Sequence, residues 1–186
     1  MKLIEELPKV FDDFGEQRKN SFITAMELKK KGIPMVGVFC TYLPQEFAEA
    51  IGAVTVSLCS VSEETIPDAE EVLPRNLCPL IKASYGFAKT DKCPYFYFSD
   101  LVIGETTCDG KKKMYEYLSE IKPVHVMELP NSQSENGLEL WKRELYKLKQ
   151  VLEERFGVEI TEEKLREAVR RKNRERRALK AFYETM

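Results

Sequence analysis

The sequence predicts an α/β fold, because short apolar runs alternate with segments of helical character. Four such runs lie at residues 34–40, 54–60, 100–106 and 123–129. Short, nearly continuous apolar runs rich in β-branched residues are typical of strands that are buried on both faces. Strands that alternate with helices favour right-handed crossovers. We therefore expect a three-layer, Rossmann-like domain with a mostly parallel sheet of about four strands.

A helical segment is expected before the first strand. Between residues 5 and 31 apolar side chains recur at helical spacing, and Gly32 stands where a helix would end. The apolar positions are Val10, Phe11, Phe14, Phe22, Ile23, Met26 and Leu28. We predict one or two helices in an N-terminal helical segment, residues 1–33.

Residues 34–130 are predicted to form the α/β domain itself. The stretch "LPQEFAEAIGA" after the first strand suits a short helix that ends at Gly52. Further on, "LPRNLCPLIKASYGF" begins in a turn and becomes helical after Pro79, a residue type favoured in the first helical turn.

After Pro130 the pattern changes to two C-terminal helices, which we assign to residues 131–186. The segment 134–157 is amphipathic and ends near Gly157. Its apolar stripe consists of Leu138, Trp141, Leu145, Leu148 and Leu152. Thr161 is placed to cap the second helix, which has acidic residues in its first turn.

Composition limits the classes of partner and the cellular compartment. The chain has 186 residues, enough for one domain with a core, and a net charge of −2 that predicts no nucleic-acid or membrane partner. No apolar span of 18 residues occurs, and acidic residues interrupt the start of the chain. We expect a cytoplasmic protein. Its five cysteines are then not a disulfide framework, because that compartment is reducing and the number is odd.

Cysteines follow several of the predicted strands. Cys40 ends the first strand, Cys59 ends the second, Cys108 follows the third, and Cys78 lies in a turn before a helix. The carboxyl ends of parallel strands share the edge of the sheet where ligands bind. Thiolates from separate loops suit an iron–sulfur cluster or zinc. No CxxC pair occurs, however, so buried thiols that act as small hydrophobes are the alternative, and this alternative fits Cys59 best.

The surroundings of Cys108 favour chemistry over packing. It lies in a polar turn, residues 106–110, where a purely structural cysteine gains little from burial. The amides that open the next helix carry partial positive charge, which stabilises a thiolate. Lys111, Lys112 and Lys113 add to this field, although a run of charges also suits a solvated helical face.

Other classes of site are poorly supported. No GxGxxG sequence follows the first strand, and no P-loop is present. His125 lies in the apolar run of the fourth strand, and we interpret it as a core or edge residue rather than a ligand or base. A single histidine argues against a catalytic triad.

Four motifs occur together: "FCTYLPQEFAEAIGAVTVSLC", "LPRNLCPLIKASYGF", "SDLVIGETTCDGKKKMYEYL" and "VMELP". In combination they resemble the 2-hydroxyacyl-CoA dehydratase family, of the 2-hydroxyglutaryl-CoA dehydratase D-component type, over residues 5–186. Within that family they resemble the double-cubane-cluster branch more than the dehydratase subunits. The resemblance implies an oxygen-sensitive iron–sulfur protein that receives low-potential electrons from a separate ATP-hydrolysing activator protein.

The resemblance also implies which residues bind the cluster. Cys78 in "NLCPLIK" and Cys108 in "TTCDGKKK" match cluster-ligand positions, and Cys40 in "FCTYLP" matches a cysteine expected to join them in the double-cubane branch. Cys59 and Cys93 match no ligand position. The implied cofactor is a 4Fe–4S or double-cubane 8Fe–9S cluster. Further ligands are expected from a second α/β domain or from a homodimer or heterodimer subunit, so the 186 residues alone are expected to bind the cluster weakly.

Three hypotheses of function follow. The first is an iron–sulfur redox protein, the N-terminal half of a double-cubane, ATP-dependent reductase of small molecules. The second is a 2-hydroxyacyl-CoA dehydratase subunit, which removes water by radical chemistry while an open iron binds the thioester carbonyl of an acyl-CoA as a Lewis acid. The third is a non-enzymatic assembly domain with buried thiols. In the first hypothesis, the turn at Asp109 and Gly110 and the lysines after it would hydrogen-bond cluster sulfides.

Overall fold

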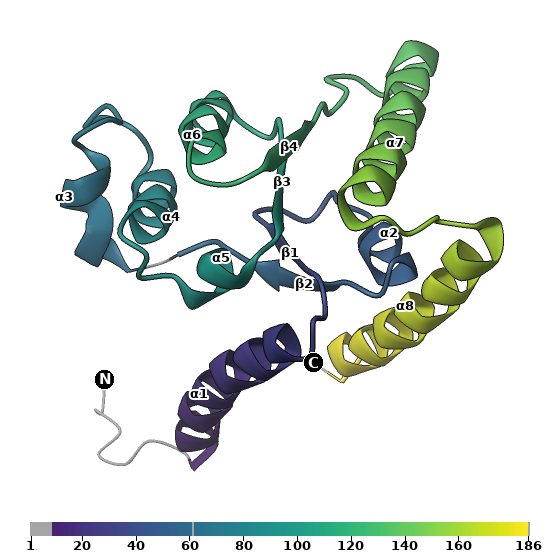
Figure 1. The fold of residues 1–186 in the computed structure, drawn as a ribbon, viewed down its shortest axis with the longest axis horizontal. Helices are drawn as coiled ribbons and strands as arrows, with labels where there is room; N and C mark the ends of the chain where they lie inside the picture. Colours follow the sequence, from purple (N-terminus) through teal and green to yellow (C-terminus); the bar gives the residue numbers. More distant parts are fainter. Residues whose placement is uncertain (1–8, 61, 186) are drawn as a thin grey trace.

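The computed structural model describes residues 9–60 and 62–185 and contains a four-stranded parallel sheet (Figure 1). The strands lie in the order β2-β1-β3-β4. They are β1 (Met35–Val38), β2 (Val54–Ser57), β3 (Leu101–Glu105) and β4 (Val124–Met127). The predicted α/β class is confirmed, together with the N-terminal helix and the two long C-terminal helices.

Helical segments connect each strand to the next in the sequence. The helices are α1 (Lys9–Lys30), α2 (Gln45–Ala50), α3 (Ile66–Ala69), α4 (Pro79–Lys89), α5 (Pro94–Phe98), α6 (Asp109–Ser119), α7 (Glu135–Phe156) and α8 (Glu162–Tyr183), with a short 3₁₀ helix at Glu63–Thr65. The predicted N-terminal segment is thus one helix, α1. Residues 5–8 of the predicted range, and the side chains of Val10, Phe11 and Phe14, lie outside the described residues.

Several predicted helix limits are confirmed. Pro79 is the first residue of α4. Gly157 ends α7 in the left-handed conformation, with a φ of 65°, which a residue without a Cβ adopts at little cost. Thr161 caps α8, because its hydroxyl accepts a hydrogen bond from the amide of Lys164 at 3.3 Å.

One face of the sheet is covered by α2, α7 and α8, and together they enclose the first hydrophobic core (Figure 1). Val36 and Ile103 enter this core from the two central strands. Leu148 and Leu152 of α7 meet them there, and Ala168 of α8 is also fully buried. The two C-terminal helices are therefore part of the packed domain.

The opposite face is covered by α3, α4, α5 and α6, which enclose a second core (Figure 1). Val102 enters it from β3, and Ile81 from α4. Met114 and Tyr115 of α6 are almost completely buried there. Successive residues of β3 thus feed opposite cores, as expected for a strand covered on both faces.

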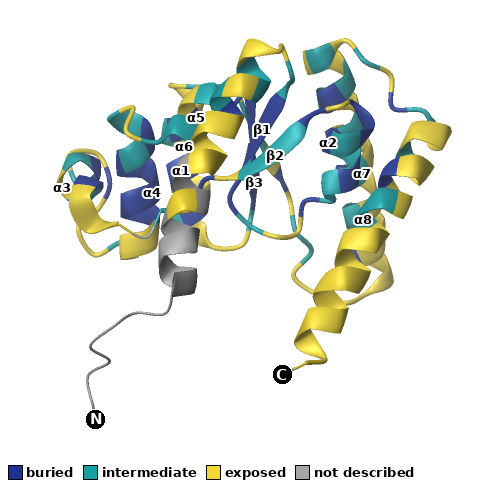
Figure 2. Cartoon of the chain, turned by 90° about the horizontal axis from the view of Figure 1, so that it is seen from below, coloured by how far each residue is buried: buried dark blue, intermediate teal, exposed yellow. Residues whose placement is uncertain are grey.

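Several sequence-based expectations of burial are wrong. The second and fourth predicted buried strands, at residues 54–60 and 123–129, are the edge strands β2 and β4, which are only partly buried because each has one neighbour in the sheet (Figure 2 shows β2). Leu138, predicted on the apolar stripe of α7, is 66% exposed, although Gly137 beside it is buried. The buried face of α7 instead includes Glu144, which accepts a hydrogen bond from the amide of Glu128 at 3.1 Å.

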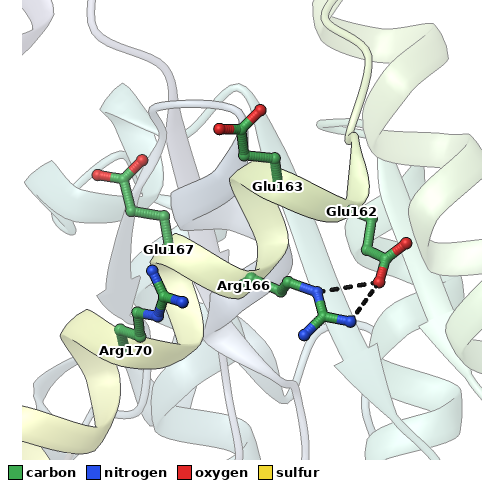
Figure 3. A pocket seen from close by; sticks show the side chains of 5 residues that line it. All are labelled: Glu162, Glu163, Arg166, Glu167 and Arg170. Atoms are coloured by element: carbon green, nitrogen blue, oxygen red, sulfur yellow. Dashed lines mark hydrogen bonds and ion pairs between the residues drawn. The ribbon is translucent and has the colours of Figure 1, made fainter.

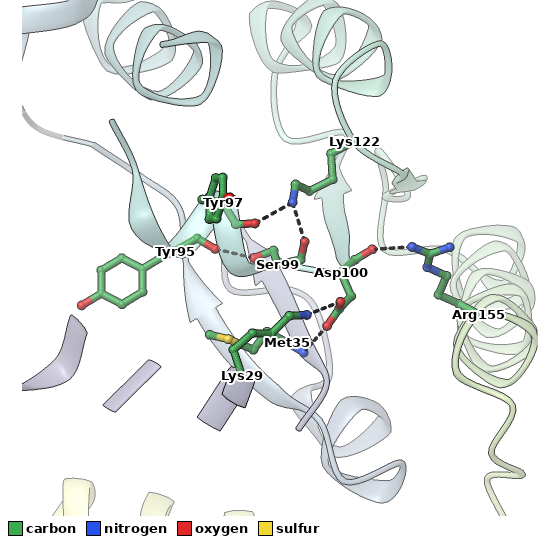
Figure 4. Close-up of polar contacts among 8 residues, drawn as sticks. All are labelled: Lys29, Met35, Tyr95, Tyr97, Ser99, Asp100, Lys122 and Arg155. Atoms are coloured by element: carbon green, nitrogen blue, oxygen red, sulfur yellow. Dashed lines mark hydrogen bonds and ion pairs between the residues drawn. The ribbon is translucent and has the colours of Figure 1, made fainter. Parts of the chain in front are cut away.

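Asp100, directly before β3, holds several elements together (Figure 4). Its carboxylate accepts a hydrogen bond from the amide of Met35 at 2.9 Å and forms an ion pair with Lys29 of α1. Its backbone carbonyl accepts a hydrogen bond from Arg155 of α7 at 3.1 Å. The amino ends of β1 and β3 are therefore fixed to helices on either side.

The described helices include none that is both long enough and apolar enough to span a membrane.

The packing of α7 predicts a large difference between two leucines of this helix. Leu148 is 0% exposed, so Leu148→Ala should lower the free energy of unfolding by about 2–5 kcal/mol by leaving a cavity. The control, Leu138→Ala, should change it by less than about 0.5 kcal/mol, because this side chain is already in solvent. Urea denaturation followed by circular dichroism measures both, and equal effects would contradict the described position of α7.

Candidate functional site

Three cysteines follow the carboxyl ends of neighbouring strands. Cys40 lies just beyond β1, Cys59 just beyond β2, and Cys108 just beyond β3. Because these strands are parallel, their carboxyl ends lie at one edge of the sheet. We call this edge, with the loops that carry Cys40, Cys59, Cys78 and Cys108, the thiol rim.

Two of the rim cysteines begin helices. Cys78 is the N-cap residue of α4, and Cys108 is the N-cap residue of α6. Both residues are exposed, and neither side chain caps its helix by a hydrogen bond within the described structure. Both thiols therefore lie beside the first-turn amides of a helix, which carry partial positive charge.

The starts of α4 and α6 are in contact. A Cβ placed on Gly110, in the first turn of α6, would meet a methyl group of Leu77 and one of Ile81 at 2.8 Å each. Leu77 directly precedes Cys78, so Gly110 lets the Cys108 turn approach the Cys78 turn closely.

Cys40 joins the same rim from the loop after β1. Its sulfur accepts a hydrogen bond from the ammonium group of Lys111 on α6 and lies 3.6 Å from the hydroxyl of Thr107, the residue before Cys108. Within residues 9–60 and 62–185, no group of three or more His, Cys, Asp or Glu side chains is arranged to hold a metal ion. The structure thus gathers Cys40, Cys78 and Cys108 at one edge, and their assignment as ligands stays a prediction.

The three lysines after Cys108 have different surroundings. Lys111 is only 9% exposed and reaches into the rim. Lys112 forms an ion pair with Asp109 at 3.0 Å, and Lys113 forms one with Glu116, both on the surface of α6. The predicted positive field at the thiols therefore comes chiefly from Lys111, while the other two lysines fit the alternative of a solvated helical face.

Glu105, the last residue of β3, is a rim residue that sequence reasoning missed. It is 1% exposed, and its Oε1 accepts a hydrogen bond from the amide of Leu43 at 2.6 Å. Among the described residues its Oε2 has no hydrogen-bond partner. Burial raises the pKa of Glu105, and the Leu43 amide and the charge of Lys111 oppose this rise. The sequence signal that could have identified Glu105 was its position as an acidic residue at the end of the apolar run "LVIGE".

Cys59 differs from its predicted role as a buried, small hydrophobe. The residue is exposed, because the chain leaves the sheet after β2, and its sulfur donates a hydrogen bond to the carbonyl of Phe39 at 2.8 Å. Partial burial of the sulfur raises the pKa of the Cys59 thiol, while Lys111 lowers it and Cys40 and Glu105 raise it. Cys59 therefore belongs to the same electrostatic group as the rim.

Cys93 and His125 have structural surroundings. The sulfur of Cys93 accepts a hydrogen bond from the amide of Phe96 at 3.3 Å and so caps α5. His125 lies on the edge strand β4, as interpreted from the sequence, and burial lowers its pKa.

A charged surface pocket lies on α8, away from these cysteines in the sequence (Figure 3). It is lined by Glu162, Glu163, Arg166, Glu167 and Arg170. Glu162 accepts hydrogen bonds from two nitrogens of Arg166, at 2.9 Å and 2.5 Å. Because all the lining residues come from one helix face and part of their charge is paired, this pocket suits a solvated surface better than a reaction site.

Fold and rim together define an α/β protein with cysteine thiols gathered at the carboxyl edge of a parallel sheet. Residues 40–186 match the family model of the 2-hydroxyglutaryl-CoA dehydratase D-component. This chain belongs to that family.

The chain is also similar to a protein of Escherichia coli (strain K12) with the name "Putative dehydratase subunit YjiM". The two sequences are 64% identical over 184 residues, which cover 98% of this chain and 48% of that relative. The chain thus spans about half the length of this relative. The family assignment made from the motifs is confirmed, and the relative's name agrees better with the dehydratase-subunit alternative than with the reductase hypothesis. These matches do not distinguish the double-cubane branch from the rest of the family.

The burial of Lys111 leads to a prediction about stability. Lys111→Met should lower the free energy of unfolding by about 1–3 kcal/mol, because it leaves the sulfur of Cys40 without its donor and the Glu105 carboxyl without its neighbouring cation. Lys112→Met is the matched control on the exposed face of α6 and should change it by less than about 0.5 kcal/mol. Both values come from urea unfolding of the reduced, metal-free protein. Equal values for the two variants would show that Lys111 is not part of the rim.

Proposed function

We propose that this chain is the cluster-bearing part of a dehydratase subunit of the 2-hydroxyacyl-CoA dehydratase type. Cys40, Cys78 and Cys108 would hold an iron–sulfur cluster, the cofactor carried by members of this family. The observation that supports the proposal most directly is that the loops carrying these three cysteines, 38 and 30 residues apart in sequence, lie at one edge of the sheet, with Cys40 close to Thr107 and Leu77 close to Gly110.

The donors present suit such a cluster in kind. Iron–sulfur clusters are held by cysteine thiolates, and they distribute these ligands over several iron atoms. Helix N-termini favour anions, and the starts of α4 and α6 meet next to Cys78 and Cys108. When bound, the group would supply low-potential electrons and an iron able to act as a Lewis acid toward a thioester carbonyl.

The remaining rim residues would control charge around the cluster. The ammonium of Lys111 donates to the sulfur of Cys40, and such a hydrogen bond to a ligand sulfur draws negative charge away from it. The buried carboxyl of Glu105 partly balances this cation. Opposite charges close to the ligands are the means by which a protein adjusts a cluster's reduction potential.

The proposal includes partners. A second α/β domain or another subunit would add the remaining ligands, an ATP-hydrolysing iron–sulfur activator would deliver electrons, and the substrate would be a 2-hydroxyacyl-CoA. The length of the similar relative, about twice that of this chain, supports a further domain.

A second candidate is the double-cubane, ATP-dependent reductase of small molecules. The position of Cys40 favours it, because a third thiol at the rim of this one chain is what the resemblance to that branch implies. Its sulfur lies close to Thr107 and Lys111, on the turn and helix that carry Cys108.

Cluster binding is tested by anaerobic reconstitution of the full-length protein with iron and sulfide. We expect visible absorption and bound iron in the wild type, and loss of most of the iron in Cys78→Ser and Cys108→Ser, because each removes one thiolate ligand. Cys93→Ser is the matched control, since this thiol caps α5, and it should retain its iron. A wild-type protein that binds neither iron nor sulfide would refute the proposed function.

Turnover separates the two candidates. With an ATP-hydrolysing activator and a low-potential electron donor, the full-length protein should convert 2-hydroxyacyl-CoA to the unsaturated acyl-CoA, which chromatography detects. The control omits the activator and should show no conversion. ATP-dependent reduction of small molecules without any dehydration would support the reductase instead.

A further inference from the structure

We propose that Cys40 and Cys59 form a chelating dithiol, a two-sulfur site for soft metal centres at the thiol rim. It deepens the proposed function by adding Cys59, which matches no ligand position of the family, to the set of rim thiols. The dithiol itself does not depend on the proposed function. Only the statement that the bound metal is the iron of a cluster rests on that function.

Strand register places the two cysteines opposite each other. In the β1–β2 pair Val38 is the partner of Ser57, so continuing the same register by two residues sets Cys40 opposite Cys59. Beyond the strand ends the two loops stay in contact, because the amide of Leu58 donates to the carbonyl of Val38 at 2.8 Å and the Cys59 sulfur donates to the carbonyl of Phe39, the residue before Cys40, at 2.8 Å. Neighbouring strands lie about 4.8 Å apart, so the loops that carry the two cysteines start side by side at Val38 and Ser57.

The two thiols share one electrostatic environment. Lys111 donates to the sulfur of Cys40, and its charge also acts on the thiol of Cys59. Soft thiolate pairs without imidazole select soft metal centres over hard ones such as Mg²⁺.

A second observation points to a bound group. Glu105 is 99% buried, its charge acts on the Cys59 thiol, and its Oε2 has no hydrogen-bond partner in the described part of the chain. Buried polar atoms in folded proteins are nearly always paired, so an unpaired carboxylate oxygen in the electrostatic neighbourhood of Cys59 and Lys111 supports a site that a bound group would complete.

Each of the two cysteines is at least partly accessible to solvent. Cys59 is exposed and lines a cavity with Ser57, Leu58 and Ser60, and Cys40, which does not line that cavity, is half-buried. Cys93 lines the same cavity, so it is the thiol that could compete with Cys40 as a partner for Cys59. This makes Cys93 the most informative control.

The test uses phenylarsine oxide on the reduced, metal-free, full-length protein in a Cys78→Ser/Cys108→Ser background. Two thiols react with one As=O group to form two As–S bonds and one water, with no change in the oxidation state of arsenic or sulfur. We expect one arsenical per chain by intact mass spectrometry, and binding roughly 100-fold weaker in Cys40→Ser and in Cys59→Ser, because one attachment point is lost. Cys93→Ser should bind as tightly as the background.

Undiminished binding in Cys59→Ser, or loss of binding in Cys93→Ser instead of Cys40→Ser, would overturn the dithiol. Circular dichroism confirms that each variant is folded.

In the otherwise wild-type protein, iron content after anaerobic reconstitution should fall in Cys59→Ser but not in Cys93→Ser. Equal iron in the two variants would overturn the assignment of Cys59 to the cluster. A wild type that takes up no iron refutes the proposed function, while the arsenical still decides the dithiol.

Discussion

The hydrogen bond from Lys111 to Cys40 is the interaction on which the rim depends. A buried ammonium is costly unless anionic or polar groups surround it, and here the Cys40 sulfur and the nearby Glu105 carboxyl do so. The bond ties the loop after β1 to α6. Because Gly110 in turn packs α6 against the start of α4, one contact fixes the mutual positions of loops that are far apart in sequence.

The amino and carboxyl edges of the sheet carry different kinds of interaction. At the amino edge, Asp100 joins α1, β1, β3 and α7 through its carboxylate and carbonyl (Figure 4). This fixes strand positions with ion pairs and backbone hydrogen bonds that involve no thiol. The carboxyl edge is left to loops whose side chains are exposed or incompletely paired, such as Cys78, Cys108 and Glu105. A rigid sheet with one open edge is the arrangement in which loops can carry chemistry without loss of the core.

Sequence patterns predicted the features that depend on local structure. The strands, the start of α4 at Pro79 and the end of α7 at Gly157 follow from apolar runs and residue types alone. Whether a strand is central or at an edge depends on strand order, which no local pattern contains, and so β2 and β4 were expected to be buried. Cys59 was interpreted as a buried thiol, and Glu105 was not singled out, for a related reason. Their surroundings depend on tertiary neighbours such as Lys111, while each looks ordinary in its own segment.

The number of thiols at the rim bears directly on the type of chemistry. An iron that binds a substrate carbonyl needs a free coordination position, whereas an iron fully held by thiolates can only transfer electrons. Each cysteine added to the set therefore moves the site from substrate activation toward electron transfer. Cys78 and Cys108 alone would leave most positions to other ligands or to substrate. Cys40, and Cys59 if the two act as a pair, would close positions from the β1–β2 side, so in the proposed cluster these two residues would favour electron transfer over substrate activation.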